Sequence, residues 1–413
     1  MSKQRPFSCL LLFSVAAFMS RPVYAETKAA PKPDKAVQQE AQEINTLVSS
    51  LPAKSFKERQ KLYDQIIRLG TAGLDALCGQ LVKPGTGDDT SARLALRGLS
   101  YYVMRPGAPA AERELYVQSL HKSLKTGPDI NVKAFICREL QLTGRAESVA
   151  PLSEILTVPD LTEPSAMSLL AISKHAAKAE VTKAMRAAYS KLTGEQASQQ
   201  VTLIRSLAAL RDRESLEAFN HAAASDNTNL RRMGLYALAN LGDPSSEASL
   251  LEAAGSKMIS ESQRVTSWLW LYARRLKEEG STDKAAELCR KVFETRTGPA
   301  DGHVQSSALH SLYEVLGDGA IDDLLASLEN KSVYVQAASA KLLMKIKSES
   351  VALKLATRLK NEDPKSRKAA LEIIAARGDA SVADTVKELL NDKEPAIRLQ
   401  AIKTYSEVAK EHS

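Results

Sequence analysis

The chain has few aromatic residues and few cysteines, and it lacks the alternating β-branched runs that are typical of half-buried strands. Aromatics make up 5% of its 413 residues, and the 19 glycines and 16 prolines fall mostly between helical patterns. Apolar residues nevertheless reach 44%, with Ala and Leu prominent, and both residues have high intrinsic helix propensity. The composition therefore excludes a sheet-based fold and favours an all-α protein.

A concentrated basic patch is also missing. The formal net charge is +7, but Lys3, Arg5 and Arg21 lie in the first 25 residues, which contain no acid. The remaining excess is small and spread over a long chain, whereas a nucleic-acid-binding surface gathers its Lys and Arg into a patch or stripe. We therefore expect no nucleic-acid partner.

The only long apolar run lies at the amino terminus, where residues 1–25 have the pattern of a signal peptide. Lys3 and Arg5 precede the apolar stretch CLLLFSVAAFM (9–19), and Val23-Tyr24-Ala25 supplies small residues for cleavage after Ala25. Eleven residues are too few to span a bilayer, which takes about 20. We expect a periplasmic or secreted protein with no membrane span, in which residues 26–43 form a flexible polar leader.

Catalytic and metal-binding motifs are absent from the sequence. The six histidines form no HExxH motif, no serine lies in a GxSxG motif, and the cysteine spacings match no zinc signature. We therefore expect a non-enzymatic protein without metal or cofactor. After cleavage Cys78, Cys137 and Cys289 remain, each in an apolar helical setting. Burial as free thiols is the expectation, and a disulfide between Cys78 and Cys137 is the alternative.

A repeat dominates the remainder of the chain. Similar amphipathic segments recur at an even step near the carboxyl end and at somewhat longer, uneven steps elsewhere, and each step is long enough for two helices and two short loops. Each segment carries a polar residue at one equivalent position, which we call the slot. The slot residues are Arg59, Arg93, Lys133, Ser165, Gln200, Arg231, Gln263, Gln305, Gln336, Arg367 and Arg398.

Small or apolar residues follow each slot at helical spacing, as at Gly234, Ala237, Leu238 and Leu241. The pattern predicts a right-handed α-solenoid of about ten to eleven two-helix repeats over residues 44–413, with one continuous apolar spine. Polar residues six positions before some slots, such as Asn330 before Gln336, predict a ladder of hydrogen bonds to the slot side chains.

Three segments carry a family resemblance: LRRMGLYALANLGD (230–243), SRKAALEIIAARGD (366–379) and IRLQAIKTYSEVAK (397–410). They resemble HEAT repeats, in particular the short bacterial type also seen in phycobilin-lyase-like proteins. A unit at about 262–300, which contains WLWLYARRLKEEGSTDKAAELCRKVFE (268–294), resembles a tetratricopeptide helix pair. The HEAT resemblance implies a scaffold that binds other proteins.

The position five residues after each slot should face the inner surface of the solenoid, away from the apolar stripe. Aromatics at this position cluster in the middle repeats, and basic residues flank them. Aromatic and Arg side chains dominate binding energy at interfaces. The predicted partner-binding residues are Arg138, Arg205, Tyr236, Trp268, His310, Lys341 and Lys403.

We therefore expect an exported scaffold that binds a protein or peptide on its concave face. The alternative is a non-catalytic accessory or subunit of a periplasmic carbohydrate-processing system, with a glycan stacked on the same aromatics. The stretch LVKPGTGDDTSARLALRGL (81–99) resembles the helical part of secreted proteins that also carry a sugar-active module.

Overall fold

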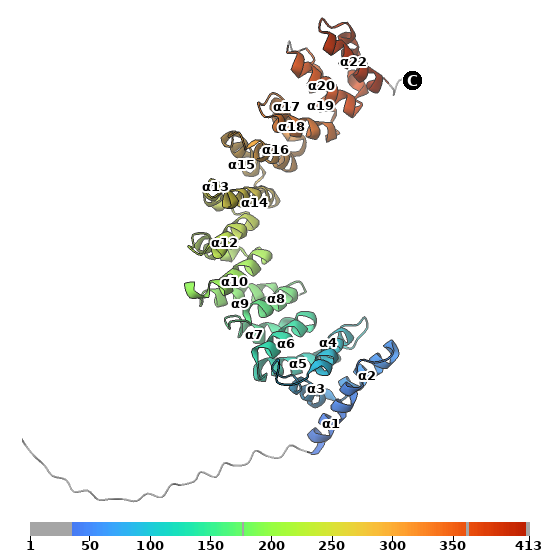
Figure 1. Cartoon of the computed structure of the whole chain (residues 1–413), viewed down its shortest axis with the longest axis vertical. Coiled ribbons are helices and arrows are strands. Elements are labelled where there is room, and N and C mark those ends of the chain that lie inside the picture. Colours follow the sequence, from blue (N-terminus) through green and yellow to red (C-terminus); the bar gives the residue numbers. More distant parts are fainter. Residues whose placement is uncertain (1–34, 176, 361–362, 410–413) are drawn as a thin grey trace, which may run out of the picture.

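Helices stack into a curved array in the computed structural model, which describes residues 35–175, 177–360 and 363–409 (Figure 1). Within these ranges no strand is present. The prediction of an all-α solenoid is therefore confirmed. The predicted signal peptide, residues 1–25, and leader residues 26–34 lie outside the described ranges.

The array has two layers. One layer contains the first helix of each repeat: α1 (Lys35–Ser49), α3 (Gly70–Gly79), α5 (Ala110–Thr126), α7 (Val149–Ser153), α9 (Lys178–Tyr189), α11 (Leu216–Ala223), α13 (Glu247–Ala254), α15 (Thr282–Thr295), α17 (Ile321–Ser327), α19 (Glu349–Arg358) and α21 (Ala383–Glu388). The other contains the second helix: α2 (Phe56–Arg68), α4 (Thr90–Val103), α6 (Ile130–Thr143), α8 (Thr162–Ser173), α10 (Ala197–Leu210), α12 (Thr228–Leu241), α14 (Ile259–Glu278), α16 (Gly302–Leu316), α18 (Val333–Lys345), α20 (Pro364–Arg377) and α22 (Pro395–Val408).

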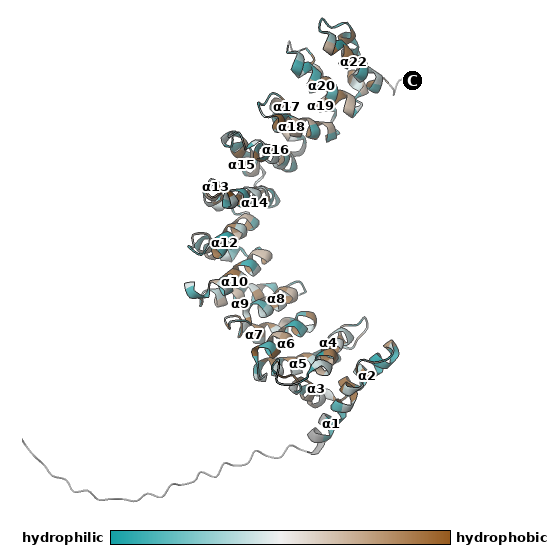
Figure 2. Cartoon of the chain, in the orientation of Figure 1, coloured by the Kyte–Doolittle hydropathy of each residue, from teal (hydrophilic) through white to brown (hydrophobic). Residues whose placement is uncertain are grey.

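Second helices from α4 to α18 lie toward the inside of the arc in Figure 1, and first helices lie toward the outside. Every slot residue falls in a second helix, at its fourth position in all cases except α14, where Gln263 is fifth. The repeat register read from the sequence therefore matches the helix boundaries from α2 to α22. Figure 2 shows polar and apolar residues mixed along the whole arc, as expected for helices that bury one stripe each.

The amino-terminal boundary of the solenoid differs from the expectation. Helix α1 begins at Lys35 rather than at residue 44, and its Ile44 and Val48 are buried in the core. Residues 35–43, expected to belong to a flexible leader, are therefore helical. The polar composition of residues 35–43 shows no apolar stripe, and the buried residues among the α1 side chains that the structure describes, Ile44 and Val48, lie in its later turns.

Slot side chains do form a ladder of hydrogen bonds, but the acceptor is usually a main-chain carbonyl. Arg231 Nη1 donates to Ser225 O (3.0 Å), Gln336 Nε2 to Asn330 O (2.7 Å), and Arg398 Nη1 to Asp392 O (2.7 Å). In each case the acceptor lies six residues earlier, where the turn inside the repeat leaves carbonyls without a helical partner. The predicted ladder is thus confirmed in position. Its acceptors are mostly main-chain carbonyls, and a side-chain acceptor of the predicted kind is present where Asp392 Oδ2 accepts from Arg367 Nη1 of the preceding repeat.

Adjacent second helices are also joined by polar side chains. Ser168 Oγ donates to Cys137 O (2.7 Å), Asn240 Nδ2 to Ala208 O (2.8 Å) and Thr404 Oγ1 to Leu371 O (3.1 Å). All three donors lie in buried side chains, and each crosses from one repeat to the next. These bonds fix the position of each second helix relative to the next, because a shift that broke them would leave a buried donor without an acceptor, at a cost in free energy.

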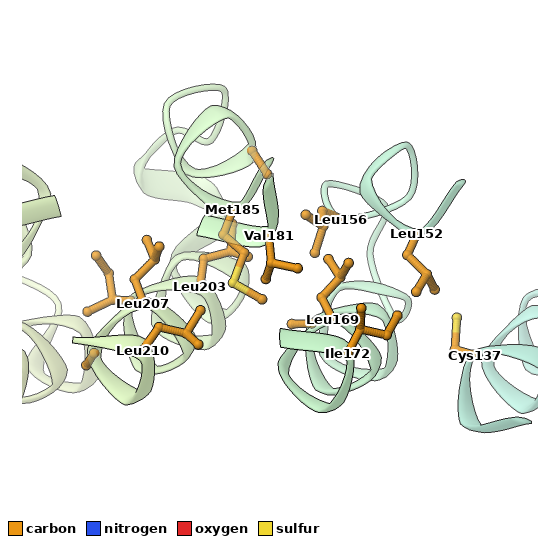
Figure 3. Close-up of a cluster of buried hydrophobic side chains, with 14 of the residues drawn as sticks. Cys137, Leu152, Leu156, Leu169, Ile172, Val181, Met185, Leu203, Leu207 and Leu210 are labelled. Atoms are coloured by element: carbon orange, nitrogen blue, oxygen red, sulfur yellow. The ribbon is translucent and has the colours of Figure 1, made fainter. Parts of the chain in front are cut away.

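Apolar side chains from both layers meet between the helices. Figure 3 shows this for Leu152 and Leu156 of the outer layer against Leu169 and Ile172 of α8, with further residues of α9 and α10 continuing the packing. The core is, however, not one continuous spine. Two clusters meet at α16, where Leu312 belongs to the first cluster, Leu309 to the second, and half-buried Tyr313 packs on both.

Cys78, Cys137 and Cys289 are buried free thiols, so the alternative of a Cys78–Cys137 disulfide does not hold. Burial raises the pKa of each thiol to about 12, and the protonated form is therefore the stable one at neutral pH. Because only the thiolate is a good nucleophile, these cysteines act as small core residues.

Among the described residues no helix is long and apolar enough to cross a bilayer.

Candidate functional site

A groove of about 690 Å³ lies on the second helices α10, α12 and α14, in the middle of the arc. We call it the central groove. Its lining combines arginines, two large aromatics and small polar residues, and no described residue of the lining is acidic. The lining residues are Ala197, Ser198, Val201, Arg205, Asn227, Asn229, Arg232, Met233, Tyr236, Arg264 and Trp268.

Helix geometry explains why these side chains face away from the outer layer. A Cβ built on Gly234 would lie 2.2 Å from the backbone nitrogen of Ala223, so this side of α12 is pressed against α11. Tyr236 is two residues further on, about 200° around the helix. It therefore points to the opposite side, into the central groove.

Two aromatic rings form one end of the central groove. Tyr236 and Trp268 pack edge to face, with ring centroids 5.8 Å apart and an interplanar angle of 66°. Both side chains are half-buried and contact the core at their inner edges. Such a pair is rigid and exposes apolar surface on one side, which suits a contact that must hold a partner in place.

Arginines surround the rings. Arg205 of α10 forms an ion pair with Glu163 of α8, and the same Glu163 oxygen accepts a hydrogen bond from Thr202 Oγ1 at 3.0 Å. Arg232 and Arg264 form no ion pair within the described chain. Each lies four residues before an aromatic ring of the groove, so every arginine–aromatic pair shares one face of its helix.

The structure brings together three of the seven predicted partner-binding residues. Arg205, Tyr236 and Trp268 line the central groove. The other four, which line no part of it, are exposed side chains on α6, α16, α18 and α22: Arg138, His310, Lys341 and Lys403. Trp270, which the repeat pattern predicts to be buried, is half-buried.

Sequence reasoning missed Arg232 and Arg264. Both occupy the position directly after a slot residue, one helical turn before the position that was singled out. The signal was present: an Arg followed four residues later by a large aromatic occurs twice, at equivalent positions of neighbouring repeats. A predicted inner surface that included two positions of each second helix, one turn apart, would have contained both these arginines and the aromatics.

A second groove of about 670 Å³ lies between α2 and α4, at the amino-terminal end of the solenoid. We call it the terminal groove. Phe56 and Tyr101, which are 68% and 63% exposed, belong to its lining. Two of its arginines already have partners: Arg59 lies over the Phe56 ring at 5.4 Å, and Arg105 lies over Tyr102 at 3.7 Å.

The third arginine of the terminal groove, Arg97, reaches Glu139 of α6, which is fully buried, at 2.8 Å. Burial raises the pKa of the Glu139 carboxyl, and a hydrogen bond from Ser100 and the charge of Arg97 oppose the rise. Among the described residues one arginine of the terminal groove, Arg59, forms no ion pair, whereas the central groove has two such arginines. This contrast makes the central groove the stronger candidate for a polar, specific contact.

The described residues contain no group of three or more His, Cys, Asp or Glu side chains placed to hold a metal ion. The chemistry that the central groove offers is recognition by charge, hydrogen bonding and aromatic packing.

Comparison with known families supports the repeat assignment. The family model for HEAT repeats matches residues 352–413, which contain α20 and α22 with the same slot geometry as the other second helices. HEAT repeats are thus identified at the carboxyl end of the chain. No curated protein matches the sequence of this chain.

Solved structures similar to this chain include Kap121p bound to Pho4p, at 12% identity and a TM-score of 0.48, covering 89% of this chain and 46% of that chain. Kap121p bound to Nup53p is similar at 11% identity and a TM-score of 0.49, covering 92% of this chain and 49% of that chain. Human deoxyhypusine hydroxylase in complex with glycerol is similar at 14% identity and a TM-score of 0.26, covering 74% of this chain and 99% of that chain. The chain thus spans about half the length of Kap121p.

Proposed function

We propose that this protein is an exported, non-enzymatic HEAT-repeat scaffold that binds a protein or peptide partner on its concave face, with the central groove as the main contact. The observation that carries the proposal is the composition of that groove. Tyr, Trp and Arg are the residue types that supply most binding energy at protein interfaces, and here all three meet in one hollow.

The face that holds the groove also suits a scaffold. Second helices α10, α12 and α14 follow one another in contact along the inner layer, so a bound segment would touch several repeats at once. Rigid aromatic side chains lose little conformational entropy on binding, and Tyr236 and Trp268 already hold each other in place. Repeat proteins use extended concave surfaces of this kind for partners.

Export is the second part of the proposal, and it is supported by the amino-terminal sequence. Lys3, Arg5, the apolar stretch 9–19 and the small residues before position 26 form the three parts of a signal peptide. Intact-mass measurement of the protein isolated from the cell envelope should give a chain that begins at Glu26. A mass that still includes residues 1–25 would contradict cleavage and leave the binding proposal standing.

The binding proposal is tested by capture of the native partner. The tagged full-length protein is expressed in its own cells, isolated with gentle cross-linking, and analysed by mass spectrometry. A true partner should be captured by the wild type and lost with Tyr236→Ala. It should be retained with Tyr101→Ala, which removes an exposed aromatic from the terminal groove. A partner captured equally by all three proteins would contradict binding at the central groove.

A further inference from the structure

The cations of the central groove form a row of their own. Arg232 of α12 and Arg264 of α14 occupy equivalent positions in neighbouring repeats, and Tyr236 and Trp268 repeat the same relation one turn later. The groove therefore has a basic side and an aromatic side that run in parallel across two repeats. A ligand that lies across α12 and α14 would meet both sides.

Neither arginine of this row is neutralised by the described chain. Arg205, the third cation, is paired with Glu163, whereas no described acidic residue forms an ion pair with Arg232 or Arg264. The Nε of Arg232 is shielded from solvent and has no hydrogen-bond acceptor among the described residues. An N–H donor in this position is costly until an acceptor reaches it, and a charged acceptor gives the strongest bond.

Helix ends add to the positive potential. Ala197 and Ser198, in the first turn of α10, and Asn229, in the first turn of α12, line the same groove. The amino terminus of a helix carries a partial positive charge, which favours an anion nearby. At α12 the Asn227 side chain already accepts from the N–H groups of Asn229 and Leu230, both at 3.1 Å, so the terminus of α10 and the two free guanidinium groups supply the available positive charge.

The remaining lining is apolar. Val201 and Met233 belong to the groove together with the arginines and the rings, and Met adapts its shape to different partners. A ligand that places only charge in the groove would leave this surface unused. The favoured ligand combines an acidic group with an adjacent apolar side chain.

We infer that the central groove recognises a peptide segment in which an Asp or Glu carboxylate binds Arg232 and Arg264 while a neighbouring apolar or aromatic side chain packs on Tyr236 and Trp268. The inference rests on the proposed function and names the chemistry of its partner.

A peptide fits better than a nucleic acid. Two free arginines are few for a polyphosphate chain, which is bound through a continuous basic stripe. The rings meet at 66°, so they present no flat platform of the kind on which successive bases stack. A carboxylate needs only one bidentate guanidinium contact to be held in a defined orientation.

The test uses an array of random 12-residue peptides, probed with the full chain and with variants. Peptides bound by the wild type should be enriched in Asp and Glu next to Leu, Phe or Tyr. The double variant Arg232→Gln/Arg264→Gln should lose this acidic preference, and the best peptide should bind it at least about tenfold more weakly in a fluorescence titration. Arg274→Gln, which changes an exposed arginine of α14 that does not line the groove, should leave both unchanged.

Glu163→Gln gives a prediction of opposite sign in the same experiment. It removes the carboxylate that competes for Arg205, so the best acidic peptide should bind roughly threefold more tightly. Bound peptides without an acidic preference, or with a basic one, would overturn the inference and leave peptide binding intact. No bound peptide at all would instead count against the proposed function. Equal, arginine-dependent binding of oligo(dT) would overturn the choice of a peptide as ligand.

Discussion

Replacing Trp268 by alanine is expected to weaken partner binding by about tenfold or more while the solenoid stays folded. The indole is half-buried, lines the central groove and meets the Tyr236 ring edge to face. Truncating a central aromatic at an interface typically costs about 2 kcal/mol or more of binding free energy. The measurement is the dissociation constant of the captured partner by calorimetry or fluorescence.

Stability separates a binding role from a core role for Trp268. An aromatic pair contributes about 0.5–1.5 kcal/mol beyond its buried area, so Trp268→Ala should lower the melting temperature by a few degrees. Trp268→Phe should keep a ring against Tyr236 and recover part of the affinity. A collapse of the melting temperature by more than about 10 °C, with loss of helical signal, would show that Trp268 is a core residue.

The repeat itself could be predicted because helix periodicity and repeat spacing are local properties. An apolar stripe at spacings of three and four fixes which face of a helix is buried, and the recurrence of this stripe along the chain identifies the equivalent residues. For this reason all eleven slot residues fall at the start of second helices. Residues 35–43 were not predicted to be helical because the polar first turns of α1 carry no such stripe.

The central groove could be predicted only in part. Arg205, Tyr236 and Trp268 share one helical position in three consecutive repeats, so the periodicity alone places them in a row. Whether the side chains of neighbouring second helices leave a groove between them depends on the distance between the helices and on how far each is shifted along its axis relative to the next. Those quantities are set by side chains that cross between repeats, such as Asn240, and not by the repeat step.

The division of the core into two clusters at α16 also depends on side chains that cross between repeats. The unusually long step before Gln305 admits the long helix α14, which has 20 residues, and α15. Arg290 of α15 then pairs with Asp323 of α17 through two bonds of 3.0 and 2.9 Å, and this hydrogen bonding raises the pKa of the Arg290 guanidinium. This Arg290–Asp323 pair lies where the first core cluster ends and the second begins. That place is next to the repeats that carry the central groove.

Gly234→Ala is expected to destabilise the protein by about 1–3 kcal/mol, although Ala is the better helix former. The added Cβ would meet the backbone of α11 at 2.2 Å from Ala223 N and 2.6 Å from Ala222 C. Backbone atoms cannot move aside as a flexible side chain can, so α11 and α12 would have to separate. Thermal or urea unfolding followed by circular dichroism measures the change.

Gly79→Ala is the matched control, because Gly79 is also helical but has no atom within 4 Å of the added Cβ. It should be neutral or stabilising by up to about 1 kcal/mol. Separation of α11 and α12 would also displace Tyr236 from Trp268, so Gly234→Ala should weaken partner binding as well, and Gly79→Ala should not. Equal stability of the two variants would mean that α11 and α12 do not pack this closely, and the orientation of Tyr236 into the central groove would lose its support.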